Sequence, residues 1–160
     1  MLANETEQDL ISQHHFCGSI EMKKDWRWTF RGFESVQEGR PIQIWFDELP
    51  EDAKYEIVDL LNFLQKVTDK RWRKPEFDPL QGAGGISEIR PQDIPIESNG
   101  KLVGIATYRI YGYFGPGEGV YTFLHGARKG VKNDRHGKRI AGDRLRQLER
   151  GEATTHEFNF

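Results

Sequence analysis

The sequence KLVGIATYRIYGYFGPGEGVYTFLHGARK, residues 101–129, organises the fold expected of this chain. Two runs within it, 102–114 and 120–129, are rich in aromatic and β-branched residues, which suit a pleated and half-buried surface. The segment between them, Gly115–Gly119, contains glycines that accept positive φ angles and a proline that lacks a backbone donor, as a tight reversal tolerates. The stretch therefore predicts a β-hairpin with one charged residue, Arg109, in the middle of its first strand.

Strand alternation predicts which polar side chains of this hairpin share a face. Residues with the parity of Arg109, among them Tyr111, lie on one side of the first strand. If all five turn residues form the loop, Arg109 lies opposite His125, and Lys129, four residues further on, keeps to the same face. A four-residue loop would instead set Arg109 against Leu124. The first of these registers gathers basic side chains on one face of the hairpin.

Three short motifs occur in a fixed order along the chain: SEIR at 87–90, YRIY at 108–111 and FLHGARKG at 123–130, followed by a basic helical segment. Together they resemble the RelE/ParE superfamily of toxins, in particular its phage-derived Gp49-like and HigB-like branch. The resemblance covers roughly residues 26–150. It implies the toxin of a type II toxin–antitoxin system, an mRNA interferase that cuts messages on the ribosome and is neutralised by a cognate antitoxin protein.

The resemblance also implies catalytic roles, because in this family an arginine of the YR strand and basic residues at the end of the last strand carry much of the catalysis. RNA cleavage needs a base for the 2′-hydroxyl, cations for the developing phosphorane charge and an acid for the leaving 5′-oxygen. Arginine forks grip phosphate oxygens, a lysine crowded by arginines becomes a base, and a histidine serves as base or acid. The candidate catalytic residues are Arg109, Lys129, Arg128, His125 and Arg90.

The distribution of charge favours a polyanionic partner. The net charge is −2, but residues 1–65 carry −7 and residues 101–150 carry +7. Basic residues also interleave with Trp72 in the connection 69–85, which suits phosphate contact with base stacking, although a solvated linker fits equally well. The candidate RNA-binding residues are Lys70, Arg71, Arg73, Lys74, Lys132, Arg135, Lys138 and Arg139. Tyr111 and Tyr113 are expected to form aromatic ledges for an antitoxin segment.

Composition and length limit the classes of protein. With 160 residues, 36% hydrophobic and 30% charged, the chain is expected to form one domain over 26–150, with an extension over 1–25 and a tail over 151–160. A single cysteine permits no internal disulfide, and neither a signal peptide nor a membrane span is expected, so a cytoplasmic location follows. No cluster of metal ligands is evident, so a metal-free and cofactor-free route through a 2′,3′-cyclic phosphate is expected.

Periodicity along the chain predicts the order of elements. Trp28 and Phe30 alternate with polar residues in a first strand, and proline residues begin two amphipathic helices with apolar stripes. The expected elements are strand 26–31, helices 41–49 and 51–67, strand 86–90, a loop over 91–100, the two hairpin strands and helix 134–150. This order predicts an α+β, RelE-like fold: a mainly antiparallel four-stranded sheet with the two N-terminal helices, together with a C-terminal helix, packed on one face, leaving the basic face open.

The same residues allow other interpretations. Arg109 could serve only to pair with Glu88 or to stack on Tyr111, and His125 could be an ordinary strand residue. A non-catalytic toxin that binds DNA gyrase, as the ParE-like branch does, is a second class, and an inactive phage-derived binding domain is a third. A ribonuclease requires Arg109 with Lys129 or His125 within reach of one phosphate, whereas a gyrase-binding protein has no such requirement.

Overall fold

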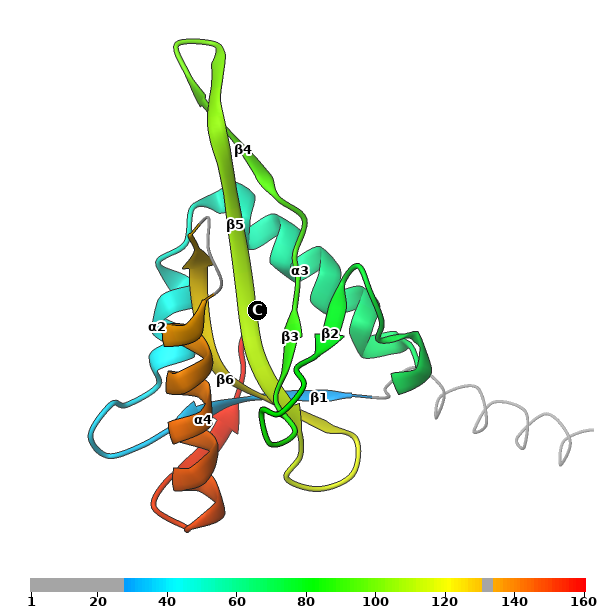
Figure 1. Cartoon of the computed structure of the whole chain (residues 1–160), viewed down its shortest axis with the longest axis vertical. Coiled ribbons are helices and arrows are strands. Elements are labelled where there is room, and N and C mark those ends of the chain that lie inside the picture. Colours follow the sequence, from blue (N-terminus) through cyan, green and yellow to red (C-terminus); the bar gives the residue numbers. More distant parts are fainter. Residues whose placement is uncertain (1–27, 131–133) are drawn as a thin grey trace, which may run out of the picture.

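A computed structural model describes residues 28–130 and 134–160 of the chain (Figure 1). The described residues form strands and helices in the order β1 (Thr29–Glu34), α2 (Pro41–Asp47), α3 (Glu51–Lys66), a short 3₁₀ helix (Asp69–Arg71), β2 (Phe77–Pro79), β3 (Ser87–Ile89), β4 (Ile94–Ser98), β5 (Lys101–Phe114), β6 (Val120–Lys129), α4 (Arg135–Glu149) and β7 (Thr154–Glu157). No helix in these two ranges is both long and apolar enough to cross a membrane.

The strands form one mixed sheet, so the expected four-stranded, mainly antiparallel sheet is wrong. Its seven strands follow the order β2-β3-β5-β6-β1-β7, with β4 paired to β5. Most neighbours are antiparallel, but β1 runs parallel to β6, with Phe30 beside Tyr121. The additional strands β2, β4 and β7 have three to five residues each, too few for a recognisable period in the sequence.

Helices cover both faces of the sheet, which corrects the expectation that all of them pack on one face. On one side, α2 and α3 bury Phe46 and Leu61 against strand residues such as Phe123. On the other side, α4 buries Leu145 against Tyr111 of β5, so the face expected to be open is partly covered. Figure 1 shows α4 and α3 flanking the long strand β5.

The two helices expected after the first strand are present. Pro41 occupies the first turn of α2, where its missing donor costs nothing, and Pro50 precedes α3 in an extended conformation. Along α3, Ala53, Ile57, Leu61 and Leu64 are buried, as the apolar stripe predicts. Each helix ends within about two residues of its expected boundary, a difference within the usual uncertainty of helix ends.

The segment 91–100, expected as a loop, contains β4 and a tight turn into β5. Asn99 and Gly100 have φ angles of 52° and 74°, as a type I′ hairpin turn requires. The resulting β4–β5 arm extends from the body of the molecule in Figure 1. The large apolar residues Leu102, Val103 and Ile105 are exposed on this arm. The signal for the hairpin was therefore present in the sequence, as an Asn-Gly pair between two strand-forming runs.

The C-terminal segment completes the sheet at its far edge. β7 pairs antiparallel with β1, and Phe158 is buried against Phe123 with 4.7 Å between ring centroids. The side chain of Gln43 donates to the carbonyl of Asn159 at 2.8 Å and accepts from its N–H at 2.9 Å, as a neighbouring strand would. Trp26 of the expected first strand lies outside the described residues.

Candidate functional site

The register of the β5–β6 hairpin decides which polar groups meet, and it differs from the expected one. Arg109 lies opposite Ala127, whereas His125 lies opposite Tyr111. Two features cause the difference: Phe114 pairs with Tyr121 instead of Val120, and the register shifts by one further residue between Tyr111 and Gly112. A Cβ atom at Gly112 would lie 2.5 Å from the carbonyl oxygen of Thr122, so only glycine permits this close approach. The expected pairing of Arg109 with His125 is therefore wrong.

Arg109 and Lys129 nevertheless share one face of the hairpin. Thr107 pairs with Lys129 and Arg109 pairs with Ala127, so Arg109 and Lys129 are diagonal neighbours across the two strands. Diagonal neighbours on one face have Cβ atoms on the order of 7 Å apart. Both side chains are half-buried. Arginine and lysine side chains that start from diagonal positions on one face are long enough to reach the same phosphate group.

Arg109 has no compensating carboxylate among the described residues. Its Nη1 donates to the carbonyl oxygen of Tyr108 at 2.8 Å. Its Nε is buried and has no hydrogen-bond partner within that same part of the chain. Arg109 does not form the ion pair with Glu88 that would have given it a purely structural role, because Glu88 binds another arginine. A half-buried guanidinium with unsatisfied donor capacity favours an anionic ligand.

Arg90 is the arginine that Glu88 binds, and its charge is already compensated. Its Nε donates to Glu88 Oε1 at 2.6 Å, and its Nη2 donates to Asp78 Oδ2 at 2.7 Å. The Glu88 residue is only 4% exposed, so this carboxylate depends on Arg90 for its counter-charge. Arg90 therefore neutralises carboxylates of the protein itself, and its guanidinium has little freedom to bind a phosphate.

A cleft of about 320 Å³ lies beside Lys129 on the face that α4 partly covers. It is lined by Asp78, Leu80, Glu88, Arg90, Tyr111, Lys129, Asp134 and Lys138. Lys129 and Lys138 supply cationic groups, while Asp134 supplies a carboxylate from the N-terminus of α4. The cleft therefore brings acidic and basic groups together at Lys129, whereas Arg109 is not part of its lining.

Tyr111 links the sheet to α4 at this cleft. Its hydroxyl donates to Asp134 Oδ2 at 3.0 Å, while Asp134 Oδ1 accepts from the backbone N–H of Gly137 at 2.9 Å and caps the helix. Burial, and next the nearby Asp134 carboxylate, raise the pKa of Tyr111 well above its ordinary value, so this phenol stays protonated. Tyr111 is fully buried, which corrects the expectation of an exposed ledge, whereas Tyr113 is half-buried.

His125 is held in the neutral state beneath α4. Its ring stacks parallel to Tyr111, with 6.2 Å between centroids and 9° between planes. Its Nδ1 lies 3.3 Å from Nη1 of Arg144. Burial, followed by the charge of Arg144, lowers the pKa of His125 to about 4. A neutral His125 has no proton to give as a general acid near pH 7, so its expected role as acid is not supported by this environment.

The remaining candidates are distributed over several surfaces. Arg128 pairs with Tyr108 and is exposed, but it lies on the opposite face of the hairpin from Lys129, because neighbouring residues alternate. Arg135 and Arg139 are exposed on the first turns of α4, and Lys138 lines the cleft. Of the expected RNA-binding residues, Lys132 and the side chain of Lys70 lie outside the described part of the chain.

The connection after α3 does not present the expected alternation of basic and aromatic side chains. Arg71 and Arg73 are exposed, and Lys74 lies 3.8 Å from Asp78. Trp72, however, is only 4% exposed, and its Nε1 donates to the carbonyl oxygen of Leu64 at 3.0 Å. Because Trp72 belongs to the core, it is not free to stack on a base, and the expected stacking role is wrong.

Several polar interactions of the site were not expected from the sequence. Glu88 and Arg90 stand two residues apart in a strand, so alternation alone predicts a shared face and could have indicated their ion pair. Arg144 is 8% exposed and bonds the carbonyl oxygen of Leu124 at 2.8 Å and Glu38 Oε1 at 2.8 Å. Nothing local distinguishes Arg144 from the other arginines of α4.

Within residues 28–130 and 134–160, no group of three or more histidine, cysteine, aspartate and glutamate side chains is arranged to hold a metal ion. Comparison of the sequence with protein-family models finds no match, and comparison with curated proteins finds none either. The geometry of this site and the motif resemblance described above are therefore the observations that bear on function.

Proposed function

We propose that this protein is the toxin of a type II toxin–antitoxin system and that it cleaves messenger RNA without a metal. The observation that carries the proposal is the diagonal pair on the β5–β6 hairpin: Arg109, with no carboxylate partner among the described residues, beside Lys129. The RelE/ParE resemblance supports it independently, since the family's arginine in the YR strand corresponds to Arg109.

The proposed chemistry is transfer of a phosphate ester to the neighbouring 2′-oxygen. The bond from the 2′-oxygen to phosphorus forms while the bond from phosphorus to the 5′-oxygen breaks, which leaves a 2′,3′-cyclic phosphate and a 5′-hydroxyl. Arg109 binds the non-bridging oxygens, where negative charge builds in the transition state. Asp134 in the cleft, in place of the lysine that the sequence suggested as base, takes the proton of the 2′-hydroxyl. The ammonium of Lys129 gives a proton to the leaving 5′-oxygen.

A second candidate function is a toxin that binds a protein target such as DNA gyrase. The observation that favours it is the exposed apolar surface of the β4–β5 arm, where Leu102 is 66% exposed, Val103 62% and Ile105 58%. Contiguous exposed apolar residues commonly mark protein interaction sites. This candidate needs neither a free Arg109 nor a phosphate site.

The experiment that tests the proposal is induction of the chain in cells, with growth and the integrity of messenger RNA followed together. We expect growth to slow while translated messages are cut, and we expect Arg109→Ala to abolish both effects. Arg150→Ala is the matched control, because Arg150 is an exposed arginine at the far end of α4. Growth arrest with intact messages would replace this proposal with the protein-binding candidate, and an absence of any phenotype would indicate an inert relative.

Cleavage by the purified chain provides the chemical test. A short single-stranded RNA incubated in the presence of a chelator should yield ends that carry a 2′,3′-cyclic phosphate and a 5′-hydroxyl. If cleavage required added divalent metal, or if it left a 5′-phosphate, the proposed route through the 2′-oxygen would be wrong even if the RNA were cut.

A further inference from the structure

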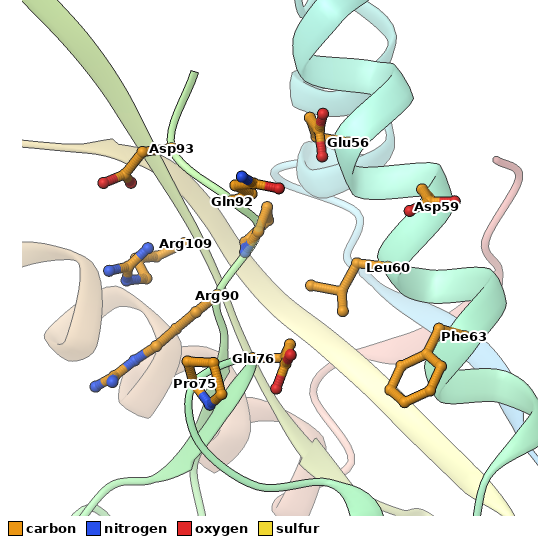
Figure 2. Close-up of a pocket in the computed structure, with 11 residues that line it drawn as sticks. Glu56, Asp59, Leu60, Phe63, Pro75, Glu76, Arg90, Gln92, Asp93 and Arg109 are labelled. Carbon is orange, nitrogen blue, oxygen red and sulfur yellow. The ribbon is translucent and has the colours of Figure 1, made fainter. Parts of the chain in front are cut away.

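A second cavity, of about 620 Å³, shares Arg90 with the cleft at Lys129 and lies between α3 and the segment that follows β3 (Figure 2). Its size is within the usual range for sites that enclose a small ligand or a side chain. One wall is α3, which contributes Glu56, Asp59, Leu60 and Phe63. The segments around β2 and β3 form the other walls, and Arg109 lies on the side of the cavity opposite α3 (Figure 2).

The charges in this cavity do not suit a phosphate. Glu56, Asp59, Glu76 and Asp93 line it, and none of them forms an ion pair within the described residues. Arg90 contributes little positive charge, because Glu88 and Asp78 neutralise it. In Figure 2 the guanidinium ends of Arg90 and Arg109 point away from α3. The wall formed by α3 therefore carries uncompensated negative charge and repels RNA.

The apolar surface of the cavity suits a planar cation. Phe63 is 47% exposed, and it stands one helical turn beyond Asp59, so a flat aromatic ring and a carboxylate adjoin on the same side of α3. Tyr55, which is 70% exposed, precedes Asp59 by one turn and extends this side of the helix. A guanidinium group is planar, stacks on aromatic rings and binds carboxylates through paired hydrogen bonds.

We propose that this cavity binds an arginine side chain carried by a basic segment of a protein partner. The guanidinium is held by Asp59 and Glu56, with Phe63 against its flat side, and the aliphatic stem lies along Leu60. Charge complementarity identifies a basic occupant, since the four carboxylates of the cavity exceed its one uncompensated cation, Arg109. This assignment is independent of RNA cleavage, although a segment bound here would pass beside Arg109.

The test uses the full chain, two tripeptides of the same length and a short single-stranded RNA. Acetyl-Gly-Arg-Gly-amide should shift the backbone resonances of α3 and of the segment 90–93 in a saturable manner, and added salt should weaken the binding. The matched citrulline peptide has the same shape without the charge, so its binding should be at least tenfold weaker. Equal binding of the citrulline peptide, or resonance shifts confined to other elements, would overturn the assignment. Shifts of α3 caused by a short single-stranded RNA would also overturn it.

Single substitutions test whether the arginine peptide binds in the cavity beside α3. Asp59→Asn should weaken binding of the arginine peptide about threefold, the size expected for loss of one exposed charge pair. Phe63→Ala should weaken it by a similar factor through loss of the stacking surface. Glu51→Gln is the matched control on the same helix, because Glu51 is exposed and does not line the cavity. Unchanged affinity in both Asp59→Asn and Phe63→Ala, with native spectra, would contradict the proposal whether or not the chain cleaves RNA.

Discussion

The two faces of the sheet are built from different chemistry. The face under α2 and α3 is a continuous aromatic cluster in which Trp72 contacts Phe30, Phe77 and Tyr121, with ring centroids 5.1 to 6.1 Å apart. The face under α4 has a smaller apolar cluster and a cleft lined by charged groups. The first face supplies the hydrophobic stabilisation of the fold, and this allows the second to keep polar groups that a core could not accommodate.

The polar face itself contains two arginines in contrasting environments. Arg90 is held between Glu88 and Asp78, whereas Arg109 has no carboxylate partner among the residues described. One guanidinium therefore balances a buried charge, and the other remains able to bind an anion. Two arginines on the same face of a sheet can therefore differ in whether their charge is available to a ligand.

The largest expected effect is on the aromatic face. Phe123 is fully buried, so Phe123→Ala should lower the free energy of unfolding by about 4 kcal/mol through lost burial and an unfilled cavity. Chemical denaturation followed by circular dichroism measures this change. Val36→Ala, at a fully exposed position, is the control and should change stability by less than about 0.5 kcal/mol. A similarly small change for Phe123→Ala would mean that this face does not dominate stability.

Arg90→Ala should lower the free energy of unfolding by about 3 kcal/mol, because it leaves the buried carboxylate of Glu88 without a counter-charge. The same denaturation experiment applies. The double variant Arg90→Met with Glu88→Gln removes both charges and should recover part of the loss. If Arg90→Ala were as stable as the wild type, the compensated environment described for this arginine would be wrong.

In contrast to Arg90→Ala, the variant Arg109→Ala should change stability little and lose most of its activity. Without an ion pair to lose, the free energy of unfolding should change by less than about 1 kcal/mol. The rate of RNA cleavage should fall roughly a hundredfold, as for removal of a group that stabilises transition-state charge. Arg109→Lys retains the charge without the fork, so full activity in this variant would show that only positive potential is required. A stable and fully active Arg109→Ala protein would contradict the proposed role.

Tyr111→Phe tests the link between the sheet and α4. It removes the hydrogen bond to Asp134 without changing the volume of the ring, so the expected loss of stability is about 1 kcal/mol. Hydrogen exchange of the first turn of α4 should increase more than exchange of α3. An equal increase in both helices would indicate a general loss of stability and no specific role for this bond.

An effect of similar size, seen only at acidic pH, concerns His125. Because its folded-state pKa of about 4 is below the ordinary value of 6.5, the unfolded state takes up the proton more readily. The loss of folding stability that this difference causes is therefore absent above about pH 6.5, and it grows as the pH falls towards 4. We expect about 1 kcal/mol at pH 5, after allowance for solvent around the half-buried ring.

Melting temperatures between pH 7 and 4.5 measure the pH effect. His125→Asn keeps an acceptor for Arg144 but does not titrate, so its melting temperature should fall less steeply than that of the wild type. The nearby groups whose charges also affect the pKa of His125 are Arg144, Asp134, His136 and Glu38. Parallel pH profiles for the two proteins would remove His125 from the explanation.

The sequence determined the elements whose signals are local. The glycines between Phe114 and Val120 define a hairpin, and the apolar stripe from Ala53 to Leu64 defines a helix, because both patterns arise from neighbouring residues. Asn99 and Gly100 held a further local signal for the β4–β5 turn. The motifs around Arg109 and Lys129 also identified the two cations that the hairpin brings together.

Only the tertiary structure decided which residues share a surface. The register at Gly112, the parallel pairing of β1 with β6 and the position of α4 all depend on contacts between distant parts of the chain. A strand changes the surroundings of every side chain when its register moves by one residue, and local periodicity does not fix that choice. For this reason His125 lies beneath α4 and Arg90 is neutralised, while Arg109 remains free of a carboxylate partner in the part of the chain described.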